Sequence, residues 1–503
     1  MAPALSSPLT SFQADAAPRP PTLAPVLATA FVVVWTLWAI GFNSAQFGDN
    51  MEQFNWSHSL EWGYHKHPPL PTWLLGGLIR LFGYQVHLAH APAAACLVGT
   101  AWLTWAIGRA LWGERVACAG VLLWGLHMYF SSRAQLYNHN TVLVLGIAFT
   151  VWCALRATQH GRWWWLLTGL GAGASMLSKY QALLPLSGLL AGLILTQRVR
   201  TRTQWQGLGF ALGVALLCLV PNVMWLIEHR FSSFDYAAEA VQAGGPLQRF
   251  KFIGSFLANQ LRTTFPMVAA IGIAVFLTRR VGVGRRSERL AAARDERVWF
   301  WCLLGWPLAV LMTLGLVGSV SLRNHWGMQS MQFFGLWLAW MWHRRAPIDW
   351  GRLVLAAALV HAVSLGVYAA QQRAGLPTAS ARRIDTLYPA QRLADAAVAQ
   401  WRSVTTCPLH YVAGDAFTAG LVSVYSGSFP AVFESPRASP WITAADLQRD
   451  GALYVLPADK PLPDGAVAAA VFDIGERPLK APSLVPRSRH LSLVVVAPAR
   501  ACR

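Results

Sequence analysis

Long apolar runs recur along almost the whole chain and restrict what it can fold into. Runs of about 17–25 apolar residues can each cross a lipid bilayer as a helix. A soluble protein carries about 25% charged residues, whereas this 503-residue chain has 13% charged and 55% hydrophobic residues. The sequence therefore predicts a polytopic α-helical membrane protein with about 11 transmembrane helices, near residues 24–42, 86–108, 115–132, 140–157, 163–178, 180–197, 204–227, 251–278, 299–318, 326–342 and 351–370.

The apolar run from Leu70 to Phe82 is too short for a span and contains Arg80, so we expect it to be an interfacial helix. With residues 1–23 as a disordered cytoplasmic tail, the arginine-rich loops then fall on the cytoplasmic side, as the positive-inside rule requires. The first outer loop, residues 43–85, and the other polar loops share the opposite face. We expect the chain in the inner membrane of a bacterium, with residues 24–370 as the membrane domain.

Residues 371–503 differ from the rest, with short alternating apolar runs instead of long ones. Segments 409–412, 452–456 and 491–496 read as strands and 390–401 as a helix, which predicts a small extracytoplasmic α/β domain. Cys407 and Cys502 could pair there. The net charge of +19 does not indicate nucleic-acid binding, because no contiguous basic face with interleaved aromatic residues occurs.

The first outer loop holds three carboxylates, Asp49, Glu52 and Glu61, and none follows before Glu114. Buried charge is costly in a membrane, so an acidic cluster beside the membrane suggests chemistry. Asp49 is a candidate general base or acceptor-positioning residue, with Glu52 one turn later in the same or a supporting role. The alternative is that Asp49 and Glu52 form a capping box at a helix start.

Other outer loops contribute cations, histidines and amides. The segment His65-Lys66-His67 precedes two prolines. Lys66 and His67 are candidates for binding a phosphate, and His65 is a candidate for binding sugar or acceptor. The spacing of His65 and His67 also suits a metal, and the alternative is that the segment is only a solvated loop. At the next junction Arg133 is a candidate phosphate ligand, whereas Asn138, His139 and Asn140 could bind sugar hydroxyls. Asn140 could instead only cap a helix.

Three further positions complete the candidate site. Lys179 could bind a lipid phosphate or only extend toward the membrane surface, and the adjacent Tyr180 could contact sugar or acceptor. Arg262 falls about three turns into a span, where a buried arginine needs an anionic partner such as a lipid phosphate. Arg323 is a further candidate for sugar or acceptor binding. A carboxylate and several cations on one face suit the transfer of a sugar from a lipid phosphate.

These motifs resemble those of glycosyltransferase family 39, the bacterial relatives of the protein O-mannosyltransferases and of the lipid A aminoarabinose transferase. The resemblance rests on residues 48–52, 63–70, 137–141, 177–180 and 221–226, with weaker similarity at 411–415 and 439–441. It implies a GT-C fold, a polyprenyl-phosphate-linked monosaccharide donor and inversion at the anomeric carbon. It maps the family's acidic pair onto Asp49 and Glu52, and its phosphate contact onto His67. Many members carry an Asp where this chain has Asn138-His139-Asn140.

The sequence thus favours transfer of a monosaccharide to a lipid, glycan or protein acceptor among the membrane lipids. Two alternatives stay open: a glycan ligase or polymerase that uses a diphosphate-linked donor, and a lipid-linked sugar transporter or flippase without chemistry. The transporter is less favoured, because transporters place charged sites near the midplane of inverted repeats. The residues do not settle the sugar or the acceptor, and they leave a divalent metal open as a cofactor.

Overall fold

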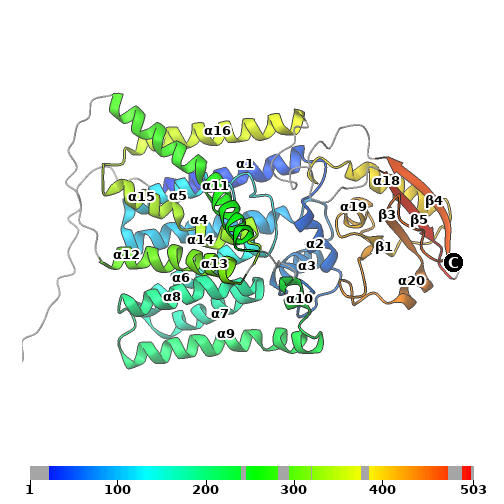
Figure 1. Ribbon diagram of the computed structural model, residues 1–503, viewed down its shortest axis with the longest axis horizontal. Helices are drawn as coiled ribbons and strands as arrows, with labels where there is room; N and C mark the ends of the chain where they lie inside the picture. Colours follow the sequence, from blue (N-terminus) through cyan, green and yellow to red (C-terminus); the bar gives the residue numbers. More distant parts are fainter. Residues whose placement is uncertain are drawn as a thin grey trace, which may run out of the picture.

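The computed structural model describes residues 22–238, 245–280, 294–318, 320–374, 385–473 and 490–499. The predicted cytoplasmic tail lies outside these ranges except for Thr22 and Leu23. A long bundle of roughly parallel and antiparallel helices carries a small β-sheet at one of its ends (Figure 1). We call that end of the bundle the sheet end and the other the opposite end.

Within the described ranges, seven helical segments are long and apolar enough to cross a membrane. They are α1 (Leu23–Phe42), α4 (His90–Trp112), α6 (His139–His160), α9 (Arg202–Glu228), α11 (Pro246–Arg280), α16 (Trp350–Ala374) and the continuous α12 (Arg294–Phe300), η2 (Trp301–Gly305) and α13 (Trp306–Val317).

The other four predicted spans are built from shorter helices, so the number eleven is consistent with the structure without being established by it. These helices are α5 (Glu114–Trp124), α7 (Arg162–Ser178), η1 (Tyr180–Ala182) with α8 (Leu183–Leu195), and η3 (Asn324–Gly327) with α14 (Met328–Met331) and α15 (Phe334–His343). The span expected at 115–132 is helical only to Trp124. Gly125 follows, and buried turns carry the chain to Asn138.

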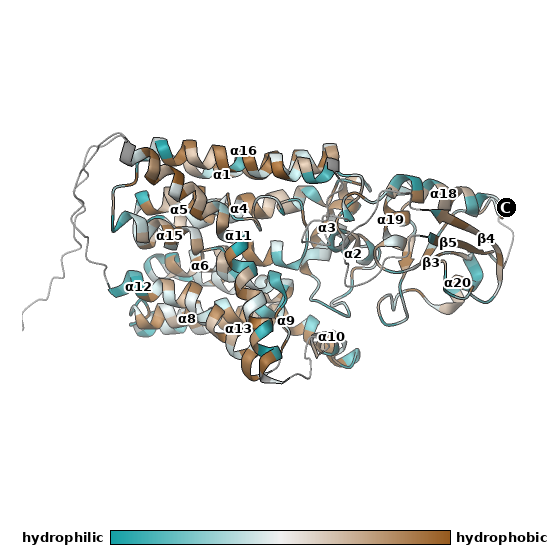
Figure 2. Cartoon of the chain, turned by 45° about the horizontal axis from the view of Figure 1, so that its top comes forward, coloured by the Kyte–Doolittle hydropathy of each residue, from teal (hydrophilic) through white to brown (hydrophobic). Residues whose placement is uncertain are grey.

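The bundle presents a broad apolar surface. Leu217 on α9, Phe265 on α11 and Val363 on α16 are each more than 60% exposed. Hydrophobic residues run the length of the bundle and hydrophilic ones gather at its ends (Figure 2). In water an apolar surface of this extent would aggregate, so the bundle is a multi-pass membrane domain.

Small residues let neighbouring helices of the bundle approach closely. A Cβ on Gly169 of α7 would lie 2.5 Å from the carbonyl oxygen of Ala211 on α9, and one on Gly146 of α6 would lie 2.6 Å from the hydroxyl of Ser175 on α7. Contacts of this kind drive helix association in lipid, where apolar side chains gain nothing from leaving water.

Three short helices lie at the sheet end: α2 (Gly48–Trp56), α3 (Leu70–Phe82) and α10 (Ser232–Ala238) (Figure 1). The helix predicted at Leu70–Phe82 is confirmed with the same bounds, and it is too short to count among the candidate spans. Its interfacial position and the sidedness of the chain stay predictions.

The C-terminal sheet has five described strands in the order β2-β1-β3-β5-β4. Strand β1 (Tyr411–Gly414) is parallel to β2 (Ala431–Phe433) and β3 (Ala452–Pro457), whereas β5 (His490–Val496) is antiparallel to β3 and β4 (Ala466–Asp473). Three helices accompany it: α18 (Ala390–Arg402), α19 (Thr418–Tyr425) and α20 (Ala444–Asp450). The predicted helix and three strands are confirmed within two residues; β2, β4, α19 and α20 were not predicted.

One hydrophobic core joins this sheet to the loops of the bundle. Met51 and Phe54 of α2 pack in the same cluster as Leu421 of α19 and Val412 of β1. The sheet therefore covers the sheet end of the bundle directly, and α2 lies between the two. Cys407 of the C-terminal region is disulfide-bonded; Cys502, its predicted partner, lies outside the described residues.

Candidate active site

The two acidic candidates lie one turn apart on α2. The helix begins at Gly48, and Phe47 at its N-cap makes no side-chain cap. Asp49 is therefore in the first turn, where a carboxylate interacts favourably with the helix dipole, and the capping-box interpretation is wrong. Asp49 Oδ2 accepts a hydrogen bond of 2.7 Å from Asn138 Nδ2. This bond joins α2 to the start of α6, two elements 89 residues apart.

Glu52 is paired with Lys66 from the loop between α2 and α3. Lys66 Nζ lies 2.5 Å from Glu52 Oε1, and the side chains are only 24% and 14% exposed. The loop is fixed against α9, because Gly63 leaves no room for a Cβ, which would lie 2.4 Å from the Trp225 ring. An ion pair in this partly buried position is held far more firmly than one on the surface.

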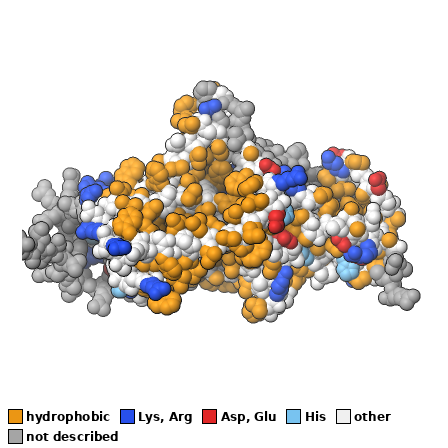
Figure 3. Space-filling model, turned by 90° about the horizontal axis from the view of Figure 1, so that it is seen from below, with side chains coloured by type: hydrophobic (Ala, Val, Ile, Leu, Met, Phe, Trp, Pro, Cys, Tyr) orange, Lys and Arg blue, Asp and Glu red, His pale blue; other side chains and the backbone are white. Residues whose placement is uncertain are grey.

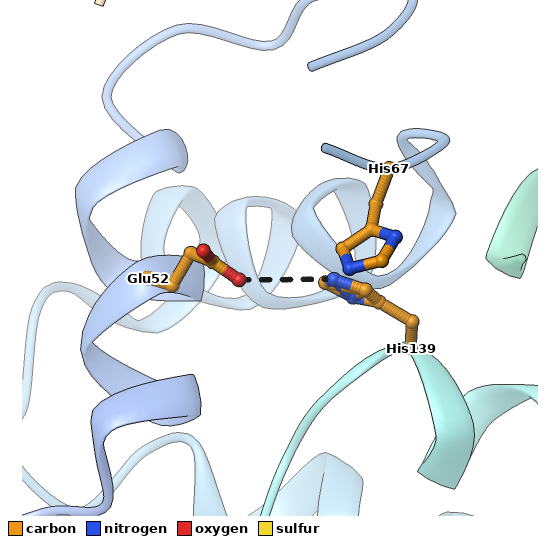
Figure 4. A group of neighbouring side chains, drawn as sticks. All are labelled: Glu52, His67 and His139. Carbon is orange, nitrogen blue, oxygen red and sulfur yellow. Dashed lines mark ion pairs between the residues drawn. The ribbon is translucent and has the colours of Figure 1, made fainter. Parts of the chain in front are cut away.

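The two histidines of the loop separate. The ring of His67 meets that of His139, the first residue of α6, with centroids 3.6 Å apart. His65 instead lies against Trp56, at 5.7 Å between ring centroids. Figure 4 shows Glu52 and His67 both directed at His139, and Glu52 Oε2 lies 3.9 Å from His139 Nε2. The predicted pairing of His65 with His67 as metal ligands therefore does not occur.

The amides of the second junction have distinct contacts. Asn138 is the N-cap of α6, and its Oδ1 accepts from the backbone N–H groups of Asn140 and Thr141. The interpretation of Asn140 as the cap is thus wrong by two positions. Asn140 Oδ1 accepts instead from Lys179 Nζ, at 2.8 Å. Lys179 is 7% exposed, so its charge lies inside the protein beside the Asp49 and Glu52 cluster.

Tyr180 belongs to the wall of the same region. Its hydroxyl donates to Asn222 Oδ1 of α9 at 2.8 Å, and Asn222 Nδ2 donates to the carbonyl of Trp62 at 2.6 Å. Asn222 was not among the predicted site residues, although it stands in one of the motifs that carry the resemblance. It ties three separate elements together.

Two arginine candidates form a second group around Tyr129. The guanidinium of Arg133 lies 5.5 Å from the centre of the Tyr129 ring, and Asn259 Nδ2 donates to the tyrosine hydroxyl at 3.1 Å. Arg262 Nη2 donates to Asn259 Oδ1 at 3.0 Å. Arg262 is exposed rather than buried, because Asn259 one turn earlier on α11 holds it at the helix surface. The expected buried arginine is therefore wrong. Arg323, which directly precedes η3, is exposed.

Comparisons with known proteins find similar sequences and a similar fold. Residues 66–225 match the family described as dolichyl-phosphate-mannose-protein mannosyltransferase. The chain is 22% identical to the lipid A galacturonosyltransferase RgtD of Rhizobium johnstonii, over 65% of this chain and 67% of the relative. It is 26% identical to the lipopolysaccharide core galacturonosyltransferase RgtA of the same organism, over 55% of this chain and 56% of the relative. The matches thus span about half to two thirds of these relatives.

A solved structure extends the similarity to the whole fold. ArnT from Cupriavidus metallidurans, bound to undecaprenyl phosphate, superposes with a TM-score of 0.59 and 15% identity over 95% of this chain and 99% of that one. The chain therefore has the fold of this protein, and its sequence is similar to those of glycosyltransferases. The sheet that covers the bundle end is part of the superposed fold.

The structure places one more carboxyl beside this cluster, and sequence reasoning missed it. Glu434 follows β2, and its Oε1 lies 3.4 Å from Asn55 Nδ2 on α2, across 379 residues of sequence. Burial raises the pKa of Glu434 to about 7, and the negative charge of Glu52 adds to this effect. Glu434 follows a strand of only three residues, so no pattern in the sequence marked it.

The histidines of the loop are neutral near pH 7. Burial is the main cause that holds the pKa of His67 well below its usual range, and the nearby His139 and Lys179 lower it further. Burial and the charge of Lys66 lower the pKa of His65 to about 3. The cluster therefore contains carboxylates, lysines and uncharged imidazoles. A carboxylate can accept a proton or orient a hydroxyl, and lysines can stabilise charge on a departing phosphate.

Proposed function

We propose that this glycosyltransferase moves a monosaccharide from a polyprenyl-phosphate donor to a saccharide-bearing lipid at the extracytoplasmic face of the membrane. The observation that carries the proposal is the meeting of Asp49, Glu52, Lys66 and Lys179 where α2, the start of α6 and two loops come together. Asp49 and Lys179 bond to the amides of Asn138 and Asn140, and Glu52 pairs with Lys66. A buried group of charges has no structural need in a membrane protein and is expected at a functional site.

In this proposal Asp49 accepts or orients the proton of the acceptor hydroxyl. Asn138 holds one of its oxygens at 2.7 Å, so the carboxylate has a fixed direction before substrate binds. Lys66 and Lys179 stabilise the negative charge that develops on the lipid phosphate as the bond between its oxygen and the anomeric carbon breaks. The hydroxyl oxygen forms the new bond to that carbon, and the lipid phosphate leaves with the electron pair.

The donor class is supported by the superposed protein bound to undecaprenyl phosphate. The lipid acceptor is supported by relatives named for lipid A and for the lipopolysaccharide core. Such acceptors are anionic, and the exposed Arg323 and Arg437 give the sheet end cations that suit them. The arginines near Tyr129 would suit a carboxylate-bearing sugar such as a uronic acid.

The test is a transfer assay with purified full-length protein in detergent. We would supply undecaprenyl phosphate carrying a radiolabelled uronic acid, aminopentose or hexose, and an acceptor lipid with a lipopolysaccharide core. Label in the acceptor lipid from one monophosphate donor is the expected result. Transfer only from a diphosphate-linked donor would establish a ligase or polymerase instead. Movement of labelled lipid across liposomes without transfer of label would establish a flippase.

A further inference from the structure

Three ligand-bearing side chains in the candidate site come from three different elements and meet at one point. They are Glu52 of α2, His67 of the loop before α3, and His139 at the start of α6 (Figure 4). One carboxylate oxygen and one nitrogen of each ring all lie within 4.8 Å of one another. The three residues are 15 and 72 positions apart, so the fold alone creates this arrangement.

The histidine at the centre is buried without hydrogen bonds. His139 is 4% exposed, and among the described residues neither of its ring nitrogens has a hydrogen-bond partner. Glu52 Oε2 is too far away at 3.9 Å. Leaving a buried polar group unsatisfied costs about 1–3 kcal/mol. A buried imidazole that faces a carboxylate and a second imidazole without bonding either is explained by a ligand that is shared among the three.

We propose that Glu52, His67 and His139 bind a divalent transition-metal ion of the zinc class. Two imidazoles and one carboxylate are the protein ligands of many catalytic zinc sites, which keep a fourth position for water or substrate. Metal–ligand distances of about 2.1 Å place ligand atoms about 3.4 Å apart, so small side-chain rotations bring these atoms into place.

The neighbouring charges are compatible with such an ion. Lys66 contacts Glu52 through Oε1, whereas Oε2 is the oxygen that faces His139. Lys66 therefore takes the place of the hydrogen-bonding partner that usually orients a ligating carboxylate. The negative charges of Asp49 and Glu52 offset those of the two lysines, so a bound dication adds positive charge to a neutral cluster. That excess would attract a phosphate oxygen to the fourth position, and only this last step rests on the proposed function.

The test uses the full-length protein carrying a purification tag without histidine, stripped with a chelator and dialysed. Titration with zinc chloride by calorimetry, with metal content measured by mass spectrometry, is expected to give one ion per chain. Cobalt is expected to give the visible absorption of a tetrahedral site. His139→Ala and Glu52→Gln should each weaken binding at least tenfold. His65→Ala and Glu61→Gln are matched controls, because these neighbours lie outside the group, and they should bind one ion as tightly as the parent.

Two outcomes would overturn the site: no stoichiometric uptake by the stripped protein, or equal weakening by His65→Ala and His139→Ala. Circular dichroism and gel filtration of each variant separate lost binding from lost folding, and Glu52→Gln tests the site again if His139→Ala does not fold. Stripped protein that transfers sugar but takes up no metal would refute this inference and leave the proposed function standing. Protein that binds one ion but transfers sugar from no donor would support the metal site and refute the proposed function.

Discussion

The two ends of the helix bundle carry charge in different ways. At the opposite end, arginines lie on tryptophan rings or in exposed ion pairs, as Arg109 does with Trp105 and Glu114, and Arg344 does with Trp340. At the sheet end, Lys179 and Glu52 are 7% and 14% exposed, and they bond to Asn140 of α6 and to Lys66 of the loop before α3. In Figure 3 the acidic side chains on the visible face lie toward the sheet, and only basic ones lie at the opposite end.

Under the proposed function, the difference separates charges that orient the protein in the membrane from charges that take part in catalysis. An arginine that extends along an aromatic ring keeps its head in water and costs little. A buried carboxylate or lysine costs several kcal/mol unless it is paired, and it is retained where the charge itself is used. If this is right, matched substitutions at the two ends should differ in their effect on activity far more than in their effect on stability.

The largest difference is expected between two aspartates. Asp49→Asn at the sheet end should lower the rate of transfer by about 10²–10⁴-fold, because it removes a proton acceptor without changing shape. Asp349→Asn at the opposite end breaks a partly exposed ion pair with Arg352, while the amide oxygen can still accept from the Arg352 backbone N–H, so the rate should stay unchanged. Initial rates with the labelled donor measure both, and gel filtration checks folding. A fully active Asp49→Asn protein would remove the role assigned to this residue.

The second comparison uses two cations. Lys66→Ala should lower kcat by about 10²-fold, because one source of charge stabilisation at the phosphate is lost. Arg109→Ala breaks an ion pair in which the two side chains are 51% and 37% exposed, so transfer should continue at the parent rate. Steady-state kinetics provide the measurement. Equal losses in the two variants would mean that Lys66 acts only on folding.

The third comparison uses two helix N-caps. Asn138 caps α6 at the sheet end and also holds Asp49, whereas Thr201 caps α9 at the opposite end in a capping box with Gln204. Alanine at either position should reduce stability by about 1 kcal/mol. Only Asn138→Ala should also slow transfer, by about tenfold. Thermal unfolding in detergent and initial rates separate the two effects, and a normal rate for Asn138→Ala would mean that Asp49 needs no support from it.

The smallest effect concerns pH and the carboxyl supplied by the sheet. The pKa of Glu434 is raised to about 7, so the folded protein holds this proton more tightly than the unfolded chain does. Stability is therefore lost as pH rises from about 4.5 to about 7. Glutamine at position 434 does not titrate, so Glu434→Gln avoids this loss of stability. The Tm of the variant minus that of the parent should increase across this pH range and then level off. Asp446→Asn is the control. A hydrogen bond from Thr443 lowers the pKa of Asp446, so the ionised carboxylate stabilises the folded protein, and the Tm of this variant should be lower than that of the parent. A pH-independent difference for Glu434→Gln would contradict the shift.

Much of the fold follows from the sequence because lipid demands long apolar runs and short basic loops. The same reasoning finds α3, since thirteen residues with an arginine cannot span a bilayer. The same reasoning fails at α5, which ends at Trp124 although the apolar sequence continues. The buried turns that follow bond to other elements, as when the Met128 N–H donates to the carbonyl of Thr263. Periodicity does not register such tertiary bonds.

Which of the candidate residues lie together was predictable only in part. Asp49, Glu52, Lys66 and His67 come from one loop and one face, which sequence can recognise. The division of the arginines was not predictable, because Arg133 and Arg262 are drawn to Tyr129 and Asn259 rather than to the acids. Nor was Glu434, since only folding of the sheet brings it to Asn55.

The position of Glu434 has a consequence for how the protein is made. The first carboxylates of the cluster leave the ribosome early. The loop after β2, where Trp441 meets Tyr64 and Arg437 meets α10, is synthesised hundreds of residues later. A nascent chain therefore lacks these contacts until the sheet has been made and has docked on the bundle. Under the proposed function, we expect a chain that terminates before β2 to insert its helices but to transfer no sugar.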